Sequence, residues 1–145
     1  DTITARDSLE YYETKQLAVA RGDALAIRGD RRVRADVLTA HFGEGNQQAA
    51  MDRIDALGNV LVSTPTDIVR AEKGDYDPAR GIATVTGNVK ITRGETQLNG
   101  ERAEVNLETG ESRLLSSPSG ERVRGLFLPK AKSPSPSTPG STGNQ

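Results

Sequence analysis

A pattern of fifteen residues occurs three times in this chain and constrains its fold more than any other feature of the sequence. Each copy opens with a glycine, in Gly22-Asp23-Ala24, Gly58-Asn59-Val60 and Gly87-Asn88-Val89. Eleven residues after the glycine stands an aliphatic residue, followed two positions later by a small residue and then by an acid: Val33, Ala35 and Asp36; Val69, Ala71 and Glu72; Leu98, Gly100 and Glu101. Successive glycines lie 36 and 29 residues apart. Unequal spacing indicates supersecondary units joined by loops of different length, as in an antiparallel sheet, rather than the rungs of a strict solenoid.

Alternating apolar residues predict that these copies form β-strands, because a strand sends residues of equal parity to one face. Such residues flank the glycine of the second and third copies: Ile54, Ala56, Val60 and Val62, and Ala83, Val85, Val89 and Ile91. A glycine weakens a strand interior, so we expect each one to mark a bulge or bend where the sheet turns a corner. In the first copy Leu25 and Ile27 break the parity, which a local bulge or two buried faces would explain.

Composition favours an all-β fold with a thin core. Leu, Ile, Val and Phe make up 30 of the 145 residues, aromatic residues are 3% of the chain, and there are 15 glycines. These values suit a repetitive β structure filled by small aliphatic side chains better than a helical bundle. We expect one domain over residues 1–129. Residues 130–145 are rich in Ser, Pro, Gly and Thr, and we expect them to form a disordered tail.

Charge and cysteine content exclude several classes of function. The 19 basic and 20 acidic residues give a net charge of −1, so no overall positive field would collect nucleic acid. The chain has no cysteine, and its single histidine, His41, has no second imidazole for a metal site or a catalytic triad. We therefore interpret His41 as a surface or strand-end residue and expect no catalytic residue, metal or cofactor. No apolar run approaches the roughly 18 residues of a membrane helix, and we expect a soluble, processed chain.

Acidic residues leave one enzymatic alternative open, a β-helical enzyme that acts on polysaccharide with two carboxylates as general acid and base. The recurrent acids Asp36, Glu72 and Glu101 argue against it, because an active site is built once and these acids occur in every copy. We interpret them as solvated groups at strand ends or turns. Four arginines form the densest basic cluster and predict either a solvated turn or a rim that faces phosphate: Arg28, Arg31, Arg32 and Arg34.

The repeated units resemble the OstA-like repeat of the LptA family of lipopolysaccharide transport proteins. The resemblance rests on Gly58-Asn59-Val60-Leu61-Val62 and Gly87-Asn88-Val89-Lys90-Ile91, each followed by an extended segment with Ala71-Glu72 or Gly100-Glu101. It extends from about Ile3 to Leu114. The first copy departs from the pattern, with Asp23-Ala24 in place of Asn-Val, and Arg6 stands where the family usually has an acid.

This resemblance implies a twisted, V-shaped antiparallel β-jellyroll in the periplasm of a Gram-negative cell. Such a protein binds lipopolysaccharide, holds its acyl chains in an apolar groove and carries it from the inner to the outer membrane. The implied partners are an LptC-like inner-membrane component, an LptD-like outer-membrane component and further copies of the chain in a head-to-tail homo-oligomer, joined by strand edges. Two other members of the same system remain alternatives, the periplasmic domain of an LptC-like component and the N-terminal domain of the outer-membrane partner. A third alternative is a structural β module that assembles with itself and binds no lipid.

Strand parity supplies candidate residues for these tasks. Same-face aliphatic residues are predicted to line the groove: Ile54, Ala56, Val60, Val62, Val69, Ala83, Val85, Val89, Ile91, Leu98, Val105 and Leu107. Parity alone leaves open whether they line a slot or pack a closed core. The residues predicted for the partner edges are Ile3, Leu9 and Tyr11 at one end of the sheet and Val105, Leu107 and Leu114 at the other.

Overall fold

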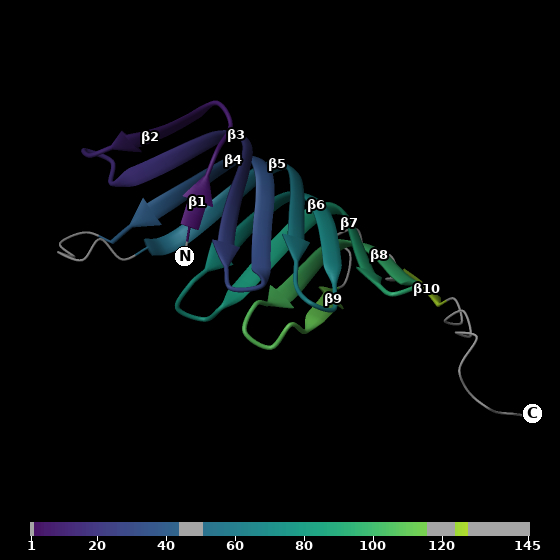
Figure 1. Cartoon of the computed structure of the whole chain (residues 1–145). Coiled ribbons are helices and arrows are strands. Elements are labelled where there is room, and N and C mark those ends of the chain that lie inside the picture. The colour runs from purple at the N-terminus through teal and green to yellow at the C-terminus, as the bar shows by residue number, and fades with distance from the viewer. Residues whose placement is uncertain (1, 44–50, 116–123, 128–145) are drawn as a thin grey trace, which may run out of the picture.

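The computed structural model describes residues 2–43, 51–115 and 124–127, the last of these by their backbone only. Within these residues one antiparallel sheet contains ten strands (Figure 1). They are β1 (Thr2–Thr4), β2 (Ser8–Tyr12), β3 (Leu17–Arg28), β4 (Arg31–Phe42), β5 (Met51–Ser63), β6 (Ile68–Asp77), β7 (Ile82–Arg93), β8 (Thr96–Asn106), β9 (Ser112–Leu115) and β10 (Arg124–Phe127). Their order is β1-β3-β4-β5-β6-β7-β8-β10, while β2 also pairs with β3 and β9 with β8. The predicted all-β antiparallel fold is confirmed, and the tail expected over residues 130–145 lies outside the described residues.

Bulges interrupt β3, β5 and β7 at the repeated glycines. Between β5 and β6, for example, the pairing passes from Leu57 with Lys73 to Val60 with Ala71. Gly58 and Asn59 thus stand opposite Glu72 alone, and their φ angles are +85° and +49°. Glycine adopts this left-handed region freely and Asn or Asp tolerates it better than other residues, which explains the repeated Gly-Asn and Gly-Asp pairs. The predicted bulges are therefore confirmed, and they require two special residues rather than one.

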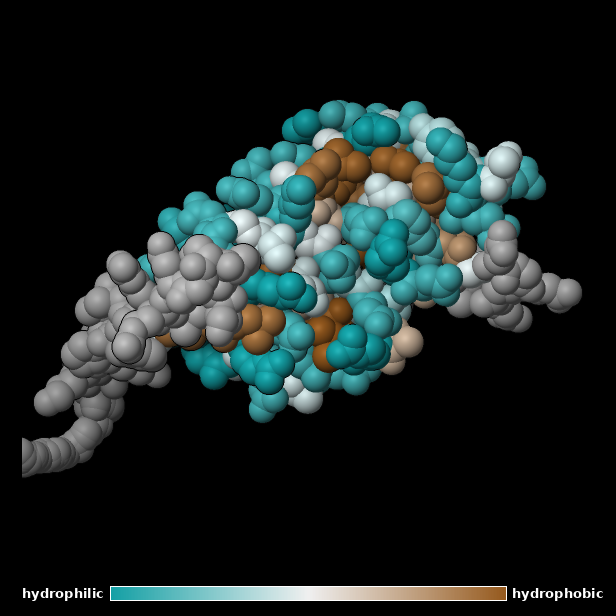
Figure 2. Space-filling model, turned by 180° about the vertical axis from the view of Figure 1, so that it is seen from behind, coloured by the Kyte–Doolittle hydropathy of each residue, from teal (hydrophilic) through white to brown (hydrophobic). Residues whose placement is uncertain are grey.

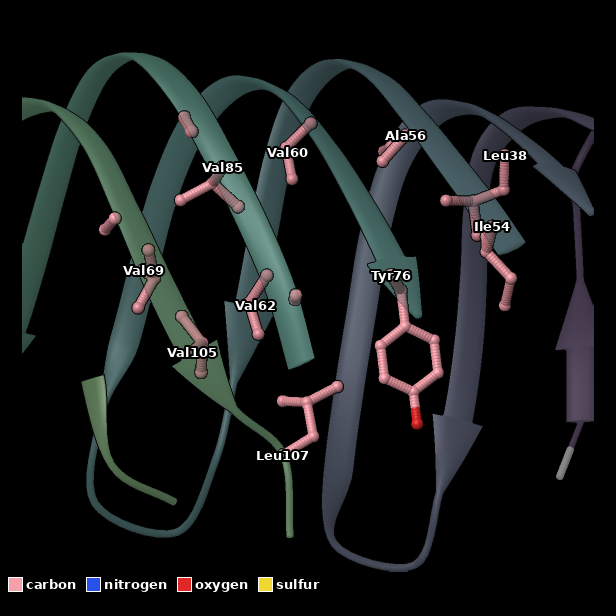
Figure 3. Packing of buried hydrophobic residues seen from close by; sticks show 14 of the residues in the cluster. Leu38, Ile54, Ala56, Val60, Val62, Val69, Tyr76, Val85, Val105 and Leu107 are labelled. Carbon is pink, nitrogen blue, oxygen red and sulfur yellow. The ribbon is translucent and has the colours of Figure 1, made fainter. Parts of the chain in front are cut away.

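The line of bulges folds the sheet into two facing arms, so that each long strand contributes to both. In Figure 3 the strands arch over the top of the view, with Val60 and Val85 near the arch and Tyr76 and Leu107 toward the opening below. Arm 1 consists of β2, β9 and residues 17–21, 37–42, 51–57, 73–77, 82–86 and 102–106. Arm 2 consists of β1, β10 and residues 24–28, 31–35, 60–63, 68–71, 89–93 and 96–100.

Rows of paired residues on the inner face of each arm form the core. One row of arm 1 runs across the strands through Leu9, Ala20, Leu38, Ala56, Gly74, Val85, Ala103 and Leu114. A matching row of arm 2 runs through Ile3, Ala26, Val33, Val62, Val69, Ile91 and Leu98. Because successive strands keep one register, side chains of equal parity meet in the same layer, and the two layers pack against each other between the arms.

The repeated acids stand in the middle of strands, beside the bulges. A Cβ atom built on Gly58 would lie 2.4 Å from Oδ2 of Asp36 in β4, and one built on Gly87 would lie 2.6 Å from Oε1 of Glu72 in β6. Asn59 Nδ2 also donates a hydrogen bond of 3.0 Å to Asp36 Oδ2. The acids are exposed, as predicted, but their assignment to strand ends or turns was wrong, because all three stand within long strands. Asp36 and Glu72 occupy space that a glycine leaves open on the neighbouring strand.

Candidate functional site: a cavity between the arms

A cavity of about 300 Å³ lies between the two arms on the side of β3 to β6. Arm 1 contributes Ile54, Ala56, Ala83 and Val85 to its walls, and arm 2 contributes Ile3, Ala26, Val33, Val60 and Val62. Figure 2 shows apolar residues in a hollow between polar ones on one face of the molecule. The volume falls at the lower end of the range for small-molecule sites, which is about 300–1,000 Å³.

The twelve residues predicted to line a groove all face the interior, but only some of them reach the cavity. Eleven belong to the buried core, and Leu98 is half-buried against it. The cavity is lined by Ile54, Ala56, Val60, Val62, Ala83, Val85 and Leu107. The other five pack the core elsewhere: Val69, Val89, Ile91, Leu98 and Val105. We call the interior around the first set the open section and the interior around the second set the closed section.

Small side chains on β3 explain why the cavity lies where it does. The inner face of this strand carries four alanines before Arg28, namely Ala18, Ala20, Ala24 and Ala26, and the last of them lines the cavity. The inner face of β7 instead carries Ala83 followed by Val85, Val89 and Ile91. Because the backbone spacing of the strands is fixed, the missing methyl and methylene groups of β3 leave empty volume between the arms.

Two arginines at the β3–β4 hairpin reach across the mouth of the cavity. Arg28 Nη1 donates a hydrogen bond of 2.8 Å to the hydroxyl of Tyr76, which lies on arm 1. Arg31 Nε donates to the carbonyl oxygen of Leu107 at 2.7 Å and Nη2 to that of Glu108 at 3.3 Å. Arg31 is also paired with Asp30 in the turn of its own hairpin. Arg28 and Arg31 therefore lie at the rim of the cavity, while Arg34 lies outside it and pairs with Asp23 at 3.5 Å.

Asp67 joins the two arms beside the closed section. Its carboxylate is 1% exposed and accepts hydrogen bonds from Arg93 Nε at 2.5 Å, Arg93 Nη2 at 2.9 Å and Ser112 Oγ at 2.6 Å. Burial acts to raise the pKa of Asp67, but the hydrogen bonds from Arg93 and Ser112 outweigh it and hold the pKa below its ordinary value. Because Asp67 lies in the β5–β6 turn and Ser112 in β9, this cluster fastens arm 2 to arm 1.

Sequence reasoning missed Tyr76 and Asp67. Both stand in segments with the composition of turns, Asp75-Tyr76-Asp77-Pro78 and Thr64-Pro65-Thr66-Asp67. Tyr76 pairs with Ile54 and Ala83, which places its side chain on the inner face. Aligning the strands around Tyr76 by the parity of Ile54 and Ala83 would have identified it as an inner-face residue. No comparable signal exists for Asp67, because its partners come from β7 and β9.

The remaining predicted site residues lie elsewhere. His41 Nε2 is 2.9 Å from Asp55 Oδ2 and 3.3 Å from Arg53 Nη2, in a small polar cluster on β4 and β5. In the part of the chain that the structure describes, no group of three or more His, Asp or Glu side chains is placed to hold a metal ion. Within the same residues no helix is long and apolar enough to cross a membrane.

The predicted partner edges are partly misplaced. Ile3 lies in the edge strand β1, Leu9 and Tyr11 lie in the edge strand β2, and Leu114 lies in β9. Val105 pairs with Ala83 on one side and Ser112 on the other, so its backbone is not at an edge. Leu107 is buried in the turn after β8. Assigning these two residues to an edge was wrong because β9 covers that side of β8.

Comparisons with known proteins agree with the fold. A family model described as LptA/(LptD N-terminal domain) LPS transport protein matches residues 2–110 and, in a second match, residues 68–124. No curated protein matches the chain. Among solved structures, LptH, the LptA-homologous periplasmic component of the conserved lipopolysaccharide transport device from Pseudomonas aeruginosa, superposes with a TM-score of 0.70. That match has 14% sequence identity and covers 88% of this chain and 94% of LptH, which shows a shared fold.

The family match confirms the resemblance inferred from the repeats, and the structural match confirms the predicted jellyroll. The family is one of transport proteins rather than enzymes, which removes the support for a β-helical polysaccharide enzyme. With more than half of its residues matched, this chain belongs to the LptA and LptD N-terminal domain family of lipopolysaccharide transport proteins.

Proposed function

We propose that this chain is a periplasmic lipopolysaccharide carrier that holds the acyl chains of the lipid between its two arms. The observation that carries the proposal is the cavity of the open section, which has aliphatic walls and a polar rim. The structural similarity to LptH, a periplasmic component, supports the compartment. Moving acyl chains from water into such a cavity is worth about 0.8 kcal/mol per buried methylene group, so even part of one chain would hold the lipid.

The proposal requires the open section to widen when lipid enters. A cavity of about 300 Å³ is small for a lipid with several acyl chains. At its mouth the arms are joined by hydrogen bonds from Arg28 and Arg31 to a hydroxyl and to carbonyl oxygens. Because the donors are charged, such bonds contribute about 1.5–3 kcal/mol each, and the burial of acyl chains must offset this cost when the arms separate.

We further propose that the chain is a bridging component, which pairs through its sheet edges with an LptC-like partner, an LptD-like partner or further copies of itself. A bridge needs a strand edge at each end, and the described sheet offers β1 with β2 at one end and β9 with β10 at the other. Leu9 and Tyr11 in β2 belong to the inner-face rows yet are 62% and 61% exposed. A strand added beside β2 would cover both and continue the apolar surface.

Site-specific photocrosslinking to radiolabelled lipopolysaccharide tests the carrier function. The crosslinking amino acid is placed at Val62, which lines the cavity, and at Lys90, which is exposed on the outer face of β7. We expect a lipid adduct from position 62 alone. Adducts from both positions, or from neither in chains whose melting curves match the unmodified chain, would contradict the proposal.

A charged substitution in the exposed edge tests the bridging function. Leu9→Asp introduces a carboxylate at a site that is open to solvent in the monomer, so we expect the monomer to fold normally and association between copies to fall. Leu57→Asp is the matched control, because Leu57 is 54% exposed on the outer face of β5, away from either edge. Equal loss of association for both variants, measured by light scattering, would place the interface elsewhere.

A further inference from the structure

The inner face of arm 2 changes from apolar to cationic at the rim of the cavity. Arg28 pairs with Arg31 across the β3–β4 hairpin, two residues beyond the pair of Ala26 with Val33. Both arginines have the parity of that inner-face pair, so their side chains point to the side on which acyl chains would lie. Aliphatic walls thus end at two guanidinium groups, an arrangement that matches an amphiphile with an anionic headgroup.

We propose that Arg28 and Arg31 bind a phosphate group of the lipid whose acyl chains occupy the cavity. The inference rests on the proposed function and names the part of the lipid that this rim recognises. Guanidinium groups form paired, charge-assisted hydrogen bonds with phosphate oxygens, and these bonds are about twice as strong as bonds between neutral groups.

The partners of the two arginines include a hydroxyl and two carbonyl oxygens, which are weaker acceptors than phosphate. Arg28 donates to the Tyr76 hydroxyl, and Arg31 donates to the carbonyl oxygens of Leu107 and Glu108. The Arg31 side chain is only 19% exposed, whereas its carboxylate partner Asp30 is 71% exposed and therefore well solvated. A phosphate at the mouth would replace neutral oxygens with an anion in a partly desolvated place, where charge interactions are stronger than in water.

The charges around the cavity favour an anion. Its lining contains three arginines, Arg28, Arg31 and Arg32, and one acid, Asp75. The outer face of the same arm differs, because Arg34 there is paired with Asp23. Phosphate attached to a lipid is favoured over free phosphate, since the acyl chains hold the headgroup at the rim and raise its effective concentration there.

The test compares two lipids that share their acyl chains, diphosphoryl lipid A and the same lipid after phosphatase treatment. We expect the unmodified protein to bind the diphosphoryl form about tenfold more tightly, as one charge-assisted hydrogen bond requires. In Arg28→Gln/Arg31→Gln the amide groups still donate hydrogen bonds, but the charge is gone. This double variant is expected to bind both lipids equally, with the affinity that the unmodified protein has for the dephosphorylated form.

Arg34→Gln/Arg70→Gln is the matched control, because it removes two positive charges from one outer-face row of arm 2. It is expected to keep the preference for the phosphorylated lipid. The preference should also weaken as salt rises in the unmodified protein and in this control. Inorganic phosphate alone is expected to give no saturable binding by calorimetry.

Three outcomes would overturn the inference. Equal binding of both lipids by the unmodified protein would leave lipid carriage intact and remove the phosphate site. An unchanged preference in Arg28→Gln/Arg31→Gln would place the site elsewhere. Saturable binding of inorganic phosphate that this variant abolishes would assign the site to the free ion. If the unmodified protein binds neither lipid, the proposed carrier function itself fails.

Discussion

The open and closed sections of the interior are built from the same repeated strands, yet one contains a cavity and the other is filled. Exposure does not separate them, because Val62 beside the cavity is 1% exposed and Val89 in the closed section is 0% exposed. The difference comes from side-chain size and from the contacts that join the arms. Alanines on the inner face of β3 leave space, whereas Asp67, Arg93 and Ser112 hold the arms together beside the closed section.

This contrast shows that one backbone pattern supports two packing states. The bulges set the angle between the arms, and the local choice between alanine and larger aliphatic residues decides whether the gap is filled. The same substitution at equivalent positions of the two sections should therefore cause different losses of folding stability, although both positions carry similar aliphatic residues.

The largest expected difference is between two carboxylates, one introduced in each section. Val89→Glu buries a charge with no partner in the closed section, and we expect it to lower the free energy of unfolding by roughly 4 kcal/mol or more. Val62→Glu puts the carboxylate into a cavity of about 300 Å³ that has room for it and for solvating water, so we expect a folded protein that no longer binds lipid. Urea unfolding and lipid binding of both variants check this. Equal destabilisation would mean that the sections are not distinct.

A smaller difference is expected for truncation of isoleucine. Ile91→Ala leaves a new void in the closed section and should destabilise by about 4 kcal/mol, near the upper end of such substitutions. Ile54→Ala enlarges a cavity that already exists and should cost about 2 kcal/mol, mainly for the lost apolar contact. The two residues are matched in exposure, at 3% and 5%. The midpoints of denaturant unfolding, at unchanged slopes, measure the difference in destabilisation between the two variants. A larger loss of stability for Ile54→Ala than for Ile91→Ala would contradict the assignment of the cavity.

Filling variants of β3 act in the opposite direction. Ala24 is fully buried and does not line the cavity, so Ala24→Leu overpacks the core and should destabilise by about 2 kcal/mol. Ala26 lines the cavity, so Ala26→Leu should change stability by less than about 1 kcal/mol and should reduce lipid binding by occupying the space. Stronger lipid binding by Ala26→Leu would show that acyl chains lie elsewhere.

The smallest effect concerns the Asp67 cluster. Ser112→Ala should cost about 1.5 kcal/mol, the lower end of the range for one hydrogen bond to a charged group, because Arg93 still pairs with Asp67. Because the folded protein holds the pKa of Asp67 below its unfolded value, the carboxylate stabilises the fold at neutral pH, and this contribution disappears as the pH falls below about 4 and through the folded pKa. Asp67→Asn should flatten that part of the curve of stability against pH, measured by thermal unfolding. A curve identical to that of the unmodified chain would exclude Asp67 as the titrating group.

Much of the fold follows from local pattern. Parity around Gly58 and Gly87 identifies the inner face of β5 and β7, and the glycines mark the bulges. The open and closed sections are not readable in this way, because the difference depends on which side chains meet across two arms. The sequence predicts either a solvated turn or a rim that faces phosphate for Arg28, because the bulge at Gly22-Asp23 shifts the parity of β3. The edge position of Val105 was wrong because the sequence gives no sign that Ser112 pairs with it.

The single folded sheet has a geometric consequence for the size of the space between the arms. Each of the long strands β3 to β8 crosses both arms, so strand length fixes the width of this space, while the number of strands fixes how far it extends. Neighbouring strands lie about 4.8 Å apart, and the eight strand positions from one edge to the other therefore span roughly 34 Å. Any strand that pairs along a whole edge adds another increment of the same cross-section. The length of the folded sheet is therefore set by the number of strands that it contains.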